Sequence, residues 1–371
     1  MPAPLIPPSI PPQPPDVREV ADAYALGRVL AEPTVAARGE MGRIWRLETS
    51  TGRWALKEVF RPQPDVAERA RADAAFQEAA RAAGIPLPRP IFARDGRVLI
   101  EVGPDADRRA VRVYSWVDLR ARDSVVPVGE VAAILGRLHG LAIADPRPID
   151  PWYRDPVPAD SWPELVARAS ASGAPWAAAL ERLVPDLVVA TAVVSDAPTI
   201  TCHLDYNPEN VLLDMGGRPV VVDWENSGPG IAEQELASAV AEFVPDPDGT
   251  EAFLSAYEEA GGPARIRDRT SFAMVLVVQA ALVRTYAERA LDSSFSAEDR
   301  ARSAHWVEDI AAHVFTMARI DRWLEEAARV RATLRTVRTS SGSELESPQL
   351  RVDPASGGHR PGRSPFRPPG P

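Results

Sequence analysis

The sequence contains a single cysteine, Cys202, among 371 residues. One cysteine can form no disulfide within the chain and no cysteine-rich metal site, so a reducing cytoplasm is the expected location. Cys202 itself is expected to pack as a small buried side chain and not to act as a nucleophile.

A surplus of positive charge is also missing. The chain has 42 Lys and Arg against 52 Asp and Glu, a net charge of −10. Binding to the phosphate backbone of a nucleic acid needs a basic face, so no nucleic-acid partner is expected. An acidic surface suits a cationic or neutral small ligand better.

Long apolar runs are absent as well. The longest, FAMVLVVQAALV at 272–283, is bracketed by arginines, and it is shorter than the ~20 residues that span a bilayer. We therefore expect a buried helix there and no membrane partner. The N-terminus lacks a basic start and an unbroken apolar core, so it is not typical of a secretory signal.

The apolar content, 45% of residues, is sufficient for a large core. Two segments are exceptions. Residues 1–15 are rich in proline and predict an extended arm, and residues 337–371 have too few apolar residues to offset the entropy of ordering, so they predict a disordered tail.

The remaining chain divides at about residue 117. Residues 16–117 read mainly as strands, with a hairpin turning at Ser50 to Gly52 and one helix over about 65–84. Residues 118–336 read mainly as helices. Helices are expected at 130–142, 231–243, 250–260, 270–291 and 298–335. The predicted fold is α+β, with a small mixed sheet in the N-terminal lobe and a larger helical C-terminal lobe.

Polar side chains concentrate in the stretch CHLDYNPENVLLDMGGRPVVVDWENSGPG at 202–230. The apolar runs NVLLD and PVVVDW flank a Gly-Gly pair, which indicates a hairpin. If Gly216 and Gly217 are its two turn residues, Asn210 lies directly opposite Asp223. Two hard oxygen ligands side by side suit Mg²⁺, which takes its other ligands from phosphate and water.

Asp205 lies in the loop before this hairpin. Its carboxylate is ionised at neutral pH and can orient a hydroxyl group and accept its proton. One carboxylate for a nucleophile and two groups for a metal are the minimum set for phosphoryl transfer.

HLDYNPEN followed by VVDW resembles the catalytic and metal-binding motifs of the aminoglycoside phosphotransferase and choline kinase-like superfamily, which has the protein-kinase fold. The resemblance extends through RWALKEVF, GIPLPRPI and LGRLHGL, over roughly residues 25–325. It implies that Asp205 is the catalytic base, that Asn210 and Asp223 hold magnesium, and that Lys57 holds the α and β phosphates of ATP or GTP. His203 is expected to brace the catalytic loop by hydrogen bonding.

The same resemblance implies an acidic partner for Lys57 on the helix that follows it. Glu78 matches the expected distance from GIPLP, and Glu68 is the alternative. Glu225 is expected to support the site or lie on the surface, with a direct role at the metal or substrate as the alternative.

Two further segments are expected to bind the nucleotide. Gly39 and Gly42 in ARGEMGRIW would let backbone N–H groups approach phosphate. The backbone near Tyr114 and Trp116 would contact adenine.

Departures from the protein-kinase pattern favour a small-molecule acceptor. Leu204 stands where protein kinases have arginine, and no Ala-Pro-Glu segment follows Asp223. A P-loop motif is absent, which excludes a P-loop enzyme.

The leading interpretation is an ATP-dependent kinase acting on a hydroxyl group of an aminoglycoside-like or other amine-bearing acceptor. A metabolic kinase for choline, a sugar amine or an amino alcohol is the alternative, and a nucleotide-binding pseudokinase is the alternative outside the enzymes. The acceptor is expected to be cationic because of the net charge, Glu225 and an acidic run in the helical lobe. That run comprises Asp246, Asp248, Glu251, Glu258 and Glu259. Trp152, Trp162, Trp176 and Trp306 could hold an ammonium group, but core packing is favoured for each. A monomer or a homodimer is expected.

Overall fold

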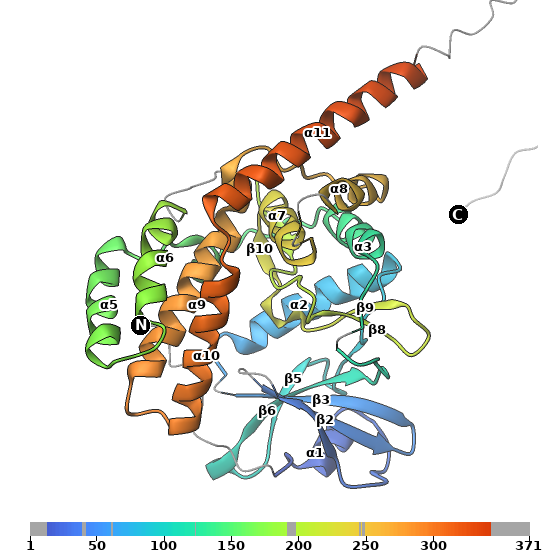
Figure 1. The fold of residues 1–371 in the computed structure, drawn as a ribbon. Coiled ribbons are helices and arrows are strands. Elements are labelled where there is room, and N and C mark those ends of the chain that lie inside the picture. Colours follow the sequence, from blue (N-terminus) through green and yellow to red (C-terminus); the bar gives the residue numbers. More distant parts are fainter. Residues whose placement is uncertain are drawn as a thin grey trace, which may run out of the picture. The chain divides into compact units, whose positions relative to one another are not determined.

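The computed structural model describes residues 13–38, 42–60, 62–122, 124–190, 198–244, 246 and 249–342, the side chains of 106, 189, 190 and 333–342 excepted. The chain separates into two compact units, Met1–Val330 and Arg331–Pro371. The sheet, the helices packed on it and the candidate site all belong to the first unit (Figure 1).

The N-terminal lobe is built on one six-stranded sheet. Its strands are β1 (Thr34–Arg38), β2 (Gly42–Thr49), β3 (Gly52–Val59), β4 (Pro90–Ile91), β5 (Leu99–Val102) and β6 (Arg109–Ser115). The strand order is β1-β2-β3-β6-β4, and β5 also pairs with β6. The hairpin of β2 and β3 has the predicted turn, since Thr49 pairs with Gly52.

Every described pairing in this sheet is antiparallel, so the predicted mixture of directions is wrong. The reason is that β6 pairs with β3, β4 and β5 and runs in the opposite direction to all three. The predicted helix is α2 (Val66–Ala82), and the structure adds α1 (Val17–Ala23) and the short turn η1 (Asp105–Asp107). The Asp16 side chain caps α1 by accepting from two backbone N–H groups.

Apolar side chains bury both faces of the sheet. Helix α1 packs with Leu47, Leu56 and Val111 on one face, and α2 packs through Ala70 and Ala74 on the other. Figure 1 shows the sheet between these two helices. Strand β6 is therefore buried along most of its length, and β3 beside it is buried at Leu56 and Glu58, so side chains there are held rigidly.

The C-terminal lobe is mainly helical, which confirms the predicted α+β fold. Its helices are α3 (Val128–Gly140), α4 (Pro151–Arg154), α5 (Trp162–Ala171), α6 (Ala177–Ala190), α7 (Ala232–Phe243), α8 (Thr250–Glu259), α9 (Ala273–Leu291), α10 (Ala297–His313) and α11 (Met317–Gly342). Short strands and turns lie between these helices: β7 (Ile200–Cys202), β8 (Val211–Leu213), β9 (Pro219–Val221), β10 (Gly228–Gly230), η2 (Ala159–Ser161), η3 (Trp224–Asn226) and η5 (Arg269–Phe272). The segments from β7 to η3 carry most of the candidate site. Helices α4, α5 and α6 were not predicted, and the helix expected over 298–335 is two helices separated at Val314.

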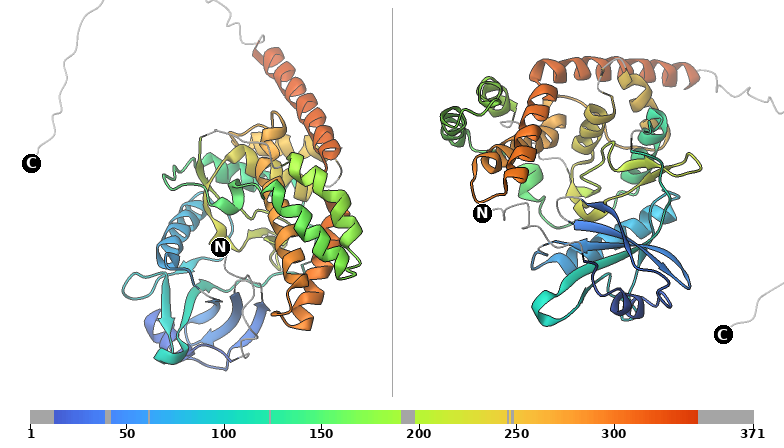
Figure 2. Two further views of the ribbon diagram at one scale, coloured as in Figure 1. Left: turned by 90° about the vertical axis from the view of Figure 1, so that its left-hand side faces the viewer. Right: turned by 60° about the horizontal axis from the view of Figure 1, so that its bottom comes forward.

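Helix α9 forms the core of this lobe, as its apolar sequence predicts. Residues Arg269–Leu291 are the one helix, in the part of the chain that the structure describes, long and apolar enough to cross a membrane by length and composition; 67% of its apolar window is buried inside the fold. Helices α5, α6 and α10 pack around it, as the two views of Figure 2 also show.

At both ends of the chain, the described structure continues into segments that the sequence predicts to be an extended arm or disordered. Pro15 is buried and the carbonyl of Gln13 accepts a hydrogen bond of 2.6 Å from Arg109, so these residues of the arm contact the N-terminal lobe. Helix α11 continues to Gly342, into the segment predicted to be disordered. Residues 1–12 and 343–371 lie outside the described residues.

Candidate active site

Strand β7 leads directly into the loop that carries Asp205. Glu235 of α7 holds this loop, because its carboxylate accepts from the backbone N–H groups of His203 and Leu204. His139 of α3 donates to the same carboxylate over 2.8 Å. Burial would raise the pKa of Glu235, but the hydrogen bonds from His139 and Leu204 lower it, and the net shift is downward. A charged carboxylate thus anchors the loop, and His139 helps to hold that carboxylate.

His203 connects the loop to strand β9, as predicted. Its Nδ1 accepts from the Asp205 N–H at 3.3 Å, and its Nε2 donates to the carbonyl of Val222 at 3.1 Å. Burial lowers the pKa of His203. The neutral ring fits this arrangement, since one nitrogen accepts and the other donates.

Three asparagine amides hold the carboxylate of Asp205. Asn207 donates to Oδ1 at 2.7 Å, while Asn210 and Asn226 donate to Oδ2 at 2.8 and 3.2 Å. Asp205 is half-buried, so its carboxylate is oriented by these amides and still accessible. Asn226 belongs to η3, a contact that sequence analysis did not predict.

The hairpin of β8 and β9 differs from the predicted register by one residue. Val211 pairs with Val221, so Asn210 lies opposite Val222 and not opposite Asp223. The reason is a three-residue loop, Met215 to Gly217, closed by the hydrogen bond from Asp214 N to Arg218 O, in which Gly217 has φ +82°.

Asn210 and Asp223 nevertheless occupy the same end of the hairpin. The Val222 N–H donates to the carbonyl of Asn210 over 2.8 Å, and Asp223 then leaves the strand in the left-handed region, with φ 60°. Asn210 directs its amide nitrogen to Asp205, so its Oδ1 is available as a ligand atom. The Asp223 side chain is 44% exposed. These two oxygen donors fit a hard cation such as Mg²⁺.

Lys57 of β3 points toward the same end of the hairpin. Its Nζ lies 2.7 Å from Asp223 Oδ1 and 2.6 Å from Glu225 Oε2. Burial lowers the pKa of Lys57, but the carboxylates of Glu225 and Asp223 raise it more, and the net shift is upward. The ammonium group is therefore charged.

The predicted partner of Lys57 on helix α2 is wrong. Glu78 pairs instead with Arg81, three residues along the same helix, and the alternative, Glu68, is exposed. Glu225 takes this place from η3, directly after the hairpin. The cause is that α2 turns neither glutamate toward the sheet.

The glycine-rich segment is only partly described. Gly39 lies outside the described residues. Gly42 begins β2, where a Cβ atom would lie 2.4 Å from the carbonyl oxygen of Glu58. Close packing against β3 therefore explains a glycine at this position without a phosphate.

The predicted adenine-binding segment follows β6. The N–H groups of Ser115 and Trp116 donate to the carbonyls of Arg89 and Arg53, at 2.9 and 3.2 Å. An adenine would therefore use carbonyl groups here or the N–H of Val117. The Tyr114 hydroxyl donates to Glu225 Oε1 at 2.9 Å, so that side chain belongs to the surroundings of Lys57.

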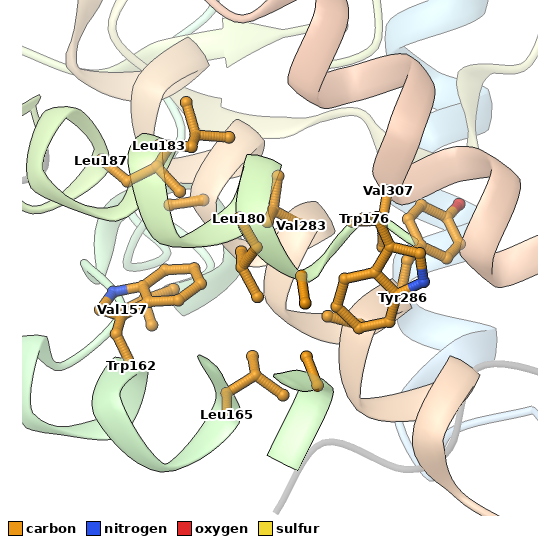
Figure 3. Packing of buried hydrophobic residues seen from close by; sticks show 14 residues of the cluster. Val157, Trp162, Leu165, Trp176, Leu180, Leu183, Leu187, Val283, Tyr286 and Val307 are labelled. Atoms are coloured by element: carbon orange, nitrogen blue, oxygen red, sulfur yellow. The ribbon is translucent and has the colours of Figure 1, made fainter. Parts of the chain in front are cut away.

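Two of the four tryptophans considered for an ammonium site are core residues, and Trp152 is half-buried. Trp162 and Trp176 are 1% and 2% exposed within the cluster around α9 that Figure 3 shows. Trp306 stacks on Tyr286 with ring centroids 6.0 Å apart. Core packing, as predicted, explains Trp162 and Trp176. Trp306 is 37% exposed, so the prediction of core packing is wrong for it.

Glu242 lies close enough to Asp205 and Glu209 for the charges of these carboxylates to interact. Burial raises the pKa of Glu242. The negative charges of Asp205 and Glu209 raise it further, whereas the positive charge of Arg319 lowers it. The acidic run predicted at 246–259 adds less negative charge near Asp205. Glu258 is paired with Arg265, and Asp248 lies outside the described residues.

Two further signals for this site are present in the sequence. Lys57 is the only lysine in the chain, although 42 residues are lysine or arginine. Glu235 directly precedes the mainly apolar run LASAVA of a predicted helix, and a carboxylate buried there requires partners. Asn226 and Glu225 follow Asp223 directly, but their partners come from distant segments.

The family model described as "Phosphotransferase enzyme family" matches residues 34–274. This range includes Lys57, Asp205, Asn210 and Asp223. Comparison with curated proteins gives no match.

Several solved structures share the fold. One is a spectinomycin phosphotransferase in complex with ADP and spectinomycin, with 12% identity, a TM-score of 0.58, and coverage of 81% of this chain and 98% of the other. An amicoumacin kinase in complex with AMP-PNP and Ca²⁺ has 15% identity, a TM-score of 0.52, and coverage of 80% and 92%. A microcompartment-associated aminopropanol kinase has 18% identity, a TM-score of 0.54, and coverage of 80% and 96%.

Proposed function

Since the chain belongs to the phosphotransferase enzyme family, we propose that it transfers the γ-phosphoryl group of ATP to a hydroxyl group of a small molecule. One observation carries the proposal. Lys57, Asp205, Asn210 and Asp223 come from separate segments and are joined by a continuous set of contacts through η3. This set supplies a phosphate-binding cation, a proton acceptor and two metal ligands.

Each residue has a role that follows from its contacts. Asp205, oriented by its amide donors, would align the acceptor hydroxyl and accept its proton as the new O–P bond forms and the bond to ADP breaks. Lys57 would exchange part of its contact with Asp223 and Glu225 for the nucleotide phosphates. Asn210 and Asp223 would hold magnesium, which when bound offsets charge on the phosphate oxygens.

The acceptor that the site supports best is amine-bearing, of the aminoglycoside type. The structures with the same fold include kinases whose names give an antibiotic and an amino alcohol. A metabolic kinase for choline, a sugar amine or an amino alcohol is the second candidate, because an aminopropanol kinase has this fold at a TM-score of 0.54. The predicted cytoplasmic location, the choice between ATP and GTP, and the oligomeric state stay predictions.

The experiment for this proposal is ADP release from ATP and Mg²⁺ in the presence of a panel of acceptors. Aminoglycosides, amino sugars, amino alcohols, peptides and nucleosides make up the panel. Release that depends on one acceptor class supports the proposal. Nucleotide binding without turnover across the whole panel would identify a pseudokinase.

Asn226→Ala is expected to lower kcat about tenfold with little change in the KM for ATP, because it removes one of the donors that orient Asp205. Steady-state kinetics measure the effect. Ser227→Ala is the matched control, since the buried hydroxyl of Ser227 finds no hydrogen-bond partner among the described residues. Equal effects of both variants would show that Asn226 acts only through the stability of η3.

The acceptor KM is expected to rise several-fold between about 0.01 and 0.5 M salt, because screening weakens the attraction of a cationic acceptor to partly exposed carboxylates. Glu209 and Glu242 supply this charge near Asp205. Steady-state kinetics at several ionic strengths test it. A KM that does not change with salt, or a neutral acceptor, would contradict the expected charge while leaving phosphoryl transfer intact.

A further inference from the structure

Lys57 is held in place without a carboxylate from helix α2. Its two contacts, Asp223 and Glu225, both follow strand β9. Asp223 is also a proposed metal ligand, so its carboxylate cannot serve Lys57 alone once a cation is bound. Glu225 is then the acid whose position decides where the ammonium group lies.

Two cations face each other across the central strands. Lys57 of β3 is directly opposite Arg112 of β6 in the antiparallel pair, so both side chains leave the same face of the sheet. Like charges at such positions repel each other unless an anion lies between them. Tyr114 shares this face, because alternate residues of a strand point the same way.

Glu225 lies between the two cations. Oε2 contacts Lys57 Nζ at 2.6 Å. Oε1 accepts from the Tyr114 hydroxyl at 2.9 Å and lies 3.8 Å from Arg112 Nη1. The Tyr114 hydrogen bond therefore fixes which carboxylate oxygen is directed toward Lys57.

Helix α2 joins this arrangement through an aspartate. Asp73 Oδ2 lies 3.1 Å from Arg112 Nη1, and these side chains are 2% and 3% exposed. Arg112 also donates to the carbonyl of Ala70 in α2 at 3.2 Å. The buried Arg112 is thus fixed by two groups of helix α2 and also lies near Glu225.

The backbone that carries Glu225 is anchored separately. The ring of Trp224 packs edge-on against Phe76 of α2, with ring centroids 5.6 Å apart, and against His203 at 4.9 Å. Trp224 Nε1 donates to Val221 O at 3.0 Å. Neighbouring contacts hold η3, so the orientation of the Glu225 side chain is left to Tyr114 and Arg112.

We propose that Tyr114 and Arg112 are positioning residues that hold Glu225 against Lys57, and that Asp73 extends this network to helix α2 in place of a direct helix glutamate. The network orients the ammonium group for the nucleotide phosphates, so the inference rests on the proposed function. Asp73, Arg112, Tyr114 and Glu225 act through Lys57 and touch no reacting atom.

Tyr114→Phe tests the proposal, because it removes one hydroxyl and keeps the ring. The affinity for ADP, measured by calorimetry with EDTA and without acceptor, should fall about fivefold or more, since a hydrogen bond to a charged group is lost. Tyr24→Phe is the matched control. Tyr24 is also buried in the N-terminal lobe, but its hydroxyl donates to the carbonyls of Val98 and Val111, so its loss should lower Tm and leave ADP affinity unchanged.

A second measurement tests whether the effect of Tyr114→Phe on ADP affinity depends on Glu225. In a Glu225→Gln background, Tyr114→Phe should change ADP affinity less than about twofold, because the two changes remove one interaction. An equal loss in both backgrounds would mean that Tyr114 contacts the nucleotide itself and would overturn the proposal. So would a loss that appears only with Mg²⁺, because Glu225 would then serve the metal and not Lys57.

The single lysine gives a direct readout that needs no nucleotide. ¹⁵N-lysine labelling yields one side-chain ammonium resonance, from Lys57. Tyr114→Phe should shift this resonance and Tyr24→Phe should not. An unshifted resonance in Tyr114→Phe would refute the contact even if the wild type failed to bind ADP, an outcome that would separately refute the proposed function.

Discussion

Replacing Asp205 with alanine is expected to lower kcat by at least about 10² while nucleotide affinity stays nearly constant. Asp205 would meet the acceptor hydroxyl, whereas Lys57 and Asp223, which contact each other, would bind the nucleotide and its metal ion. The carboxylate is fixed by three amides, so its loss removes a group already oriented for proton transfer. Calorimetry with ADP and steady-state kinetics give the two quantities.

Asp95→Ala is the control for this experiment. Asp95 is an exposed carboxylate that pairs with Arg97 in the N-terminal lobe, so its loss should leave kcat unchanged. A parallel fall in kcat and in ADP affinity for Asp205→Ala would contradict the separation of acceptor and nucleotide roles.

Asp223→Asn is expected to lower kcat/KM by about 10³ and to weaken nucleotide binding only when Mg²⁺ is present, because the change removes the negative charge of a proposed metal ligand. Asparagine is preferred to alanine here. Asp223 has φ 60°, and asparagine adopts this left-handed conformation more readily than most residues. The variant therefore changes the charge with little strain in the backbone.

The measurement for Asp223→Asn is ADP affinity with Mg²⁺ and with EDTA. Binding should be weaker than wild type in Mg²⁺ and similar to wild type in EDTA. The same loss in both conditions would show that Asp223 acts through its contact with Lys57, at 2.7 Å, and not as a metal ligand.

The hairpin of β8 and β9 shows what local sequence can predict. Its apolar runs and glycine pair correctly indicate two paired strands. The register could not be predicted from them, because the loop length depends on the bonds that Asp214 makes with Arg218. Asn210 and Asp223 still reach the same end of the hairpin, since Asp223 leaves the strand in a left-handed turn.

The partner of Lys57 was not predictable in the same way. Glu78 lies at the expected distance along the chain, but side-chain direction in a helix decides which residue faces the sheet. That residue in α2 is Asp73, and it meets Arg112. Glu225 reaches Lys57 only because the fold brings the end of β9 close to β3. Local sequence does not predict such a tertiary contact.

The helical lobe was predicted less completely than the sheet. Helix α9 was evident from its apolar run, whereas α5 and α6 lie in segments interrupted by proline and tryptophan. Trp162 and Trp176 become interpretable once the cluster around α9 is seen, because their burial leaves them no face for a ligand.

Phosphoryl transfer to a small-molecule hydroxyl is tested most directly by ³¹P NMR of ATP, Mg²⁺ and the acceptor that gives the highest ADP release. The wild type should convert the γ-phosphoryl group into a phosphate monoester of the acceptor, with ADP formed in equal amount. Asp205→Ala should form this ester at least about 10²-fold more slowly. Inorganic phosphate as the sole product, or equal ester formation by both proteins, would contradict the proposed reaction.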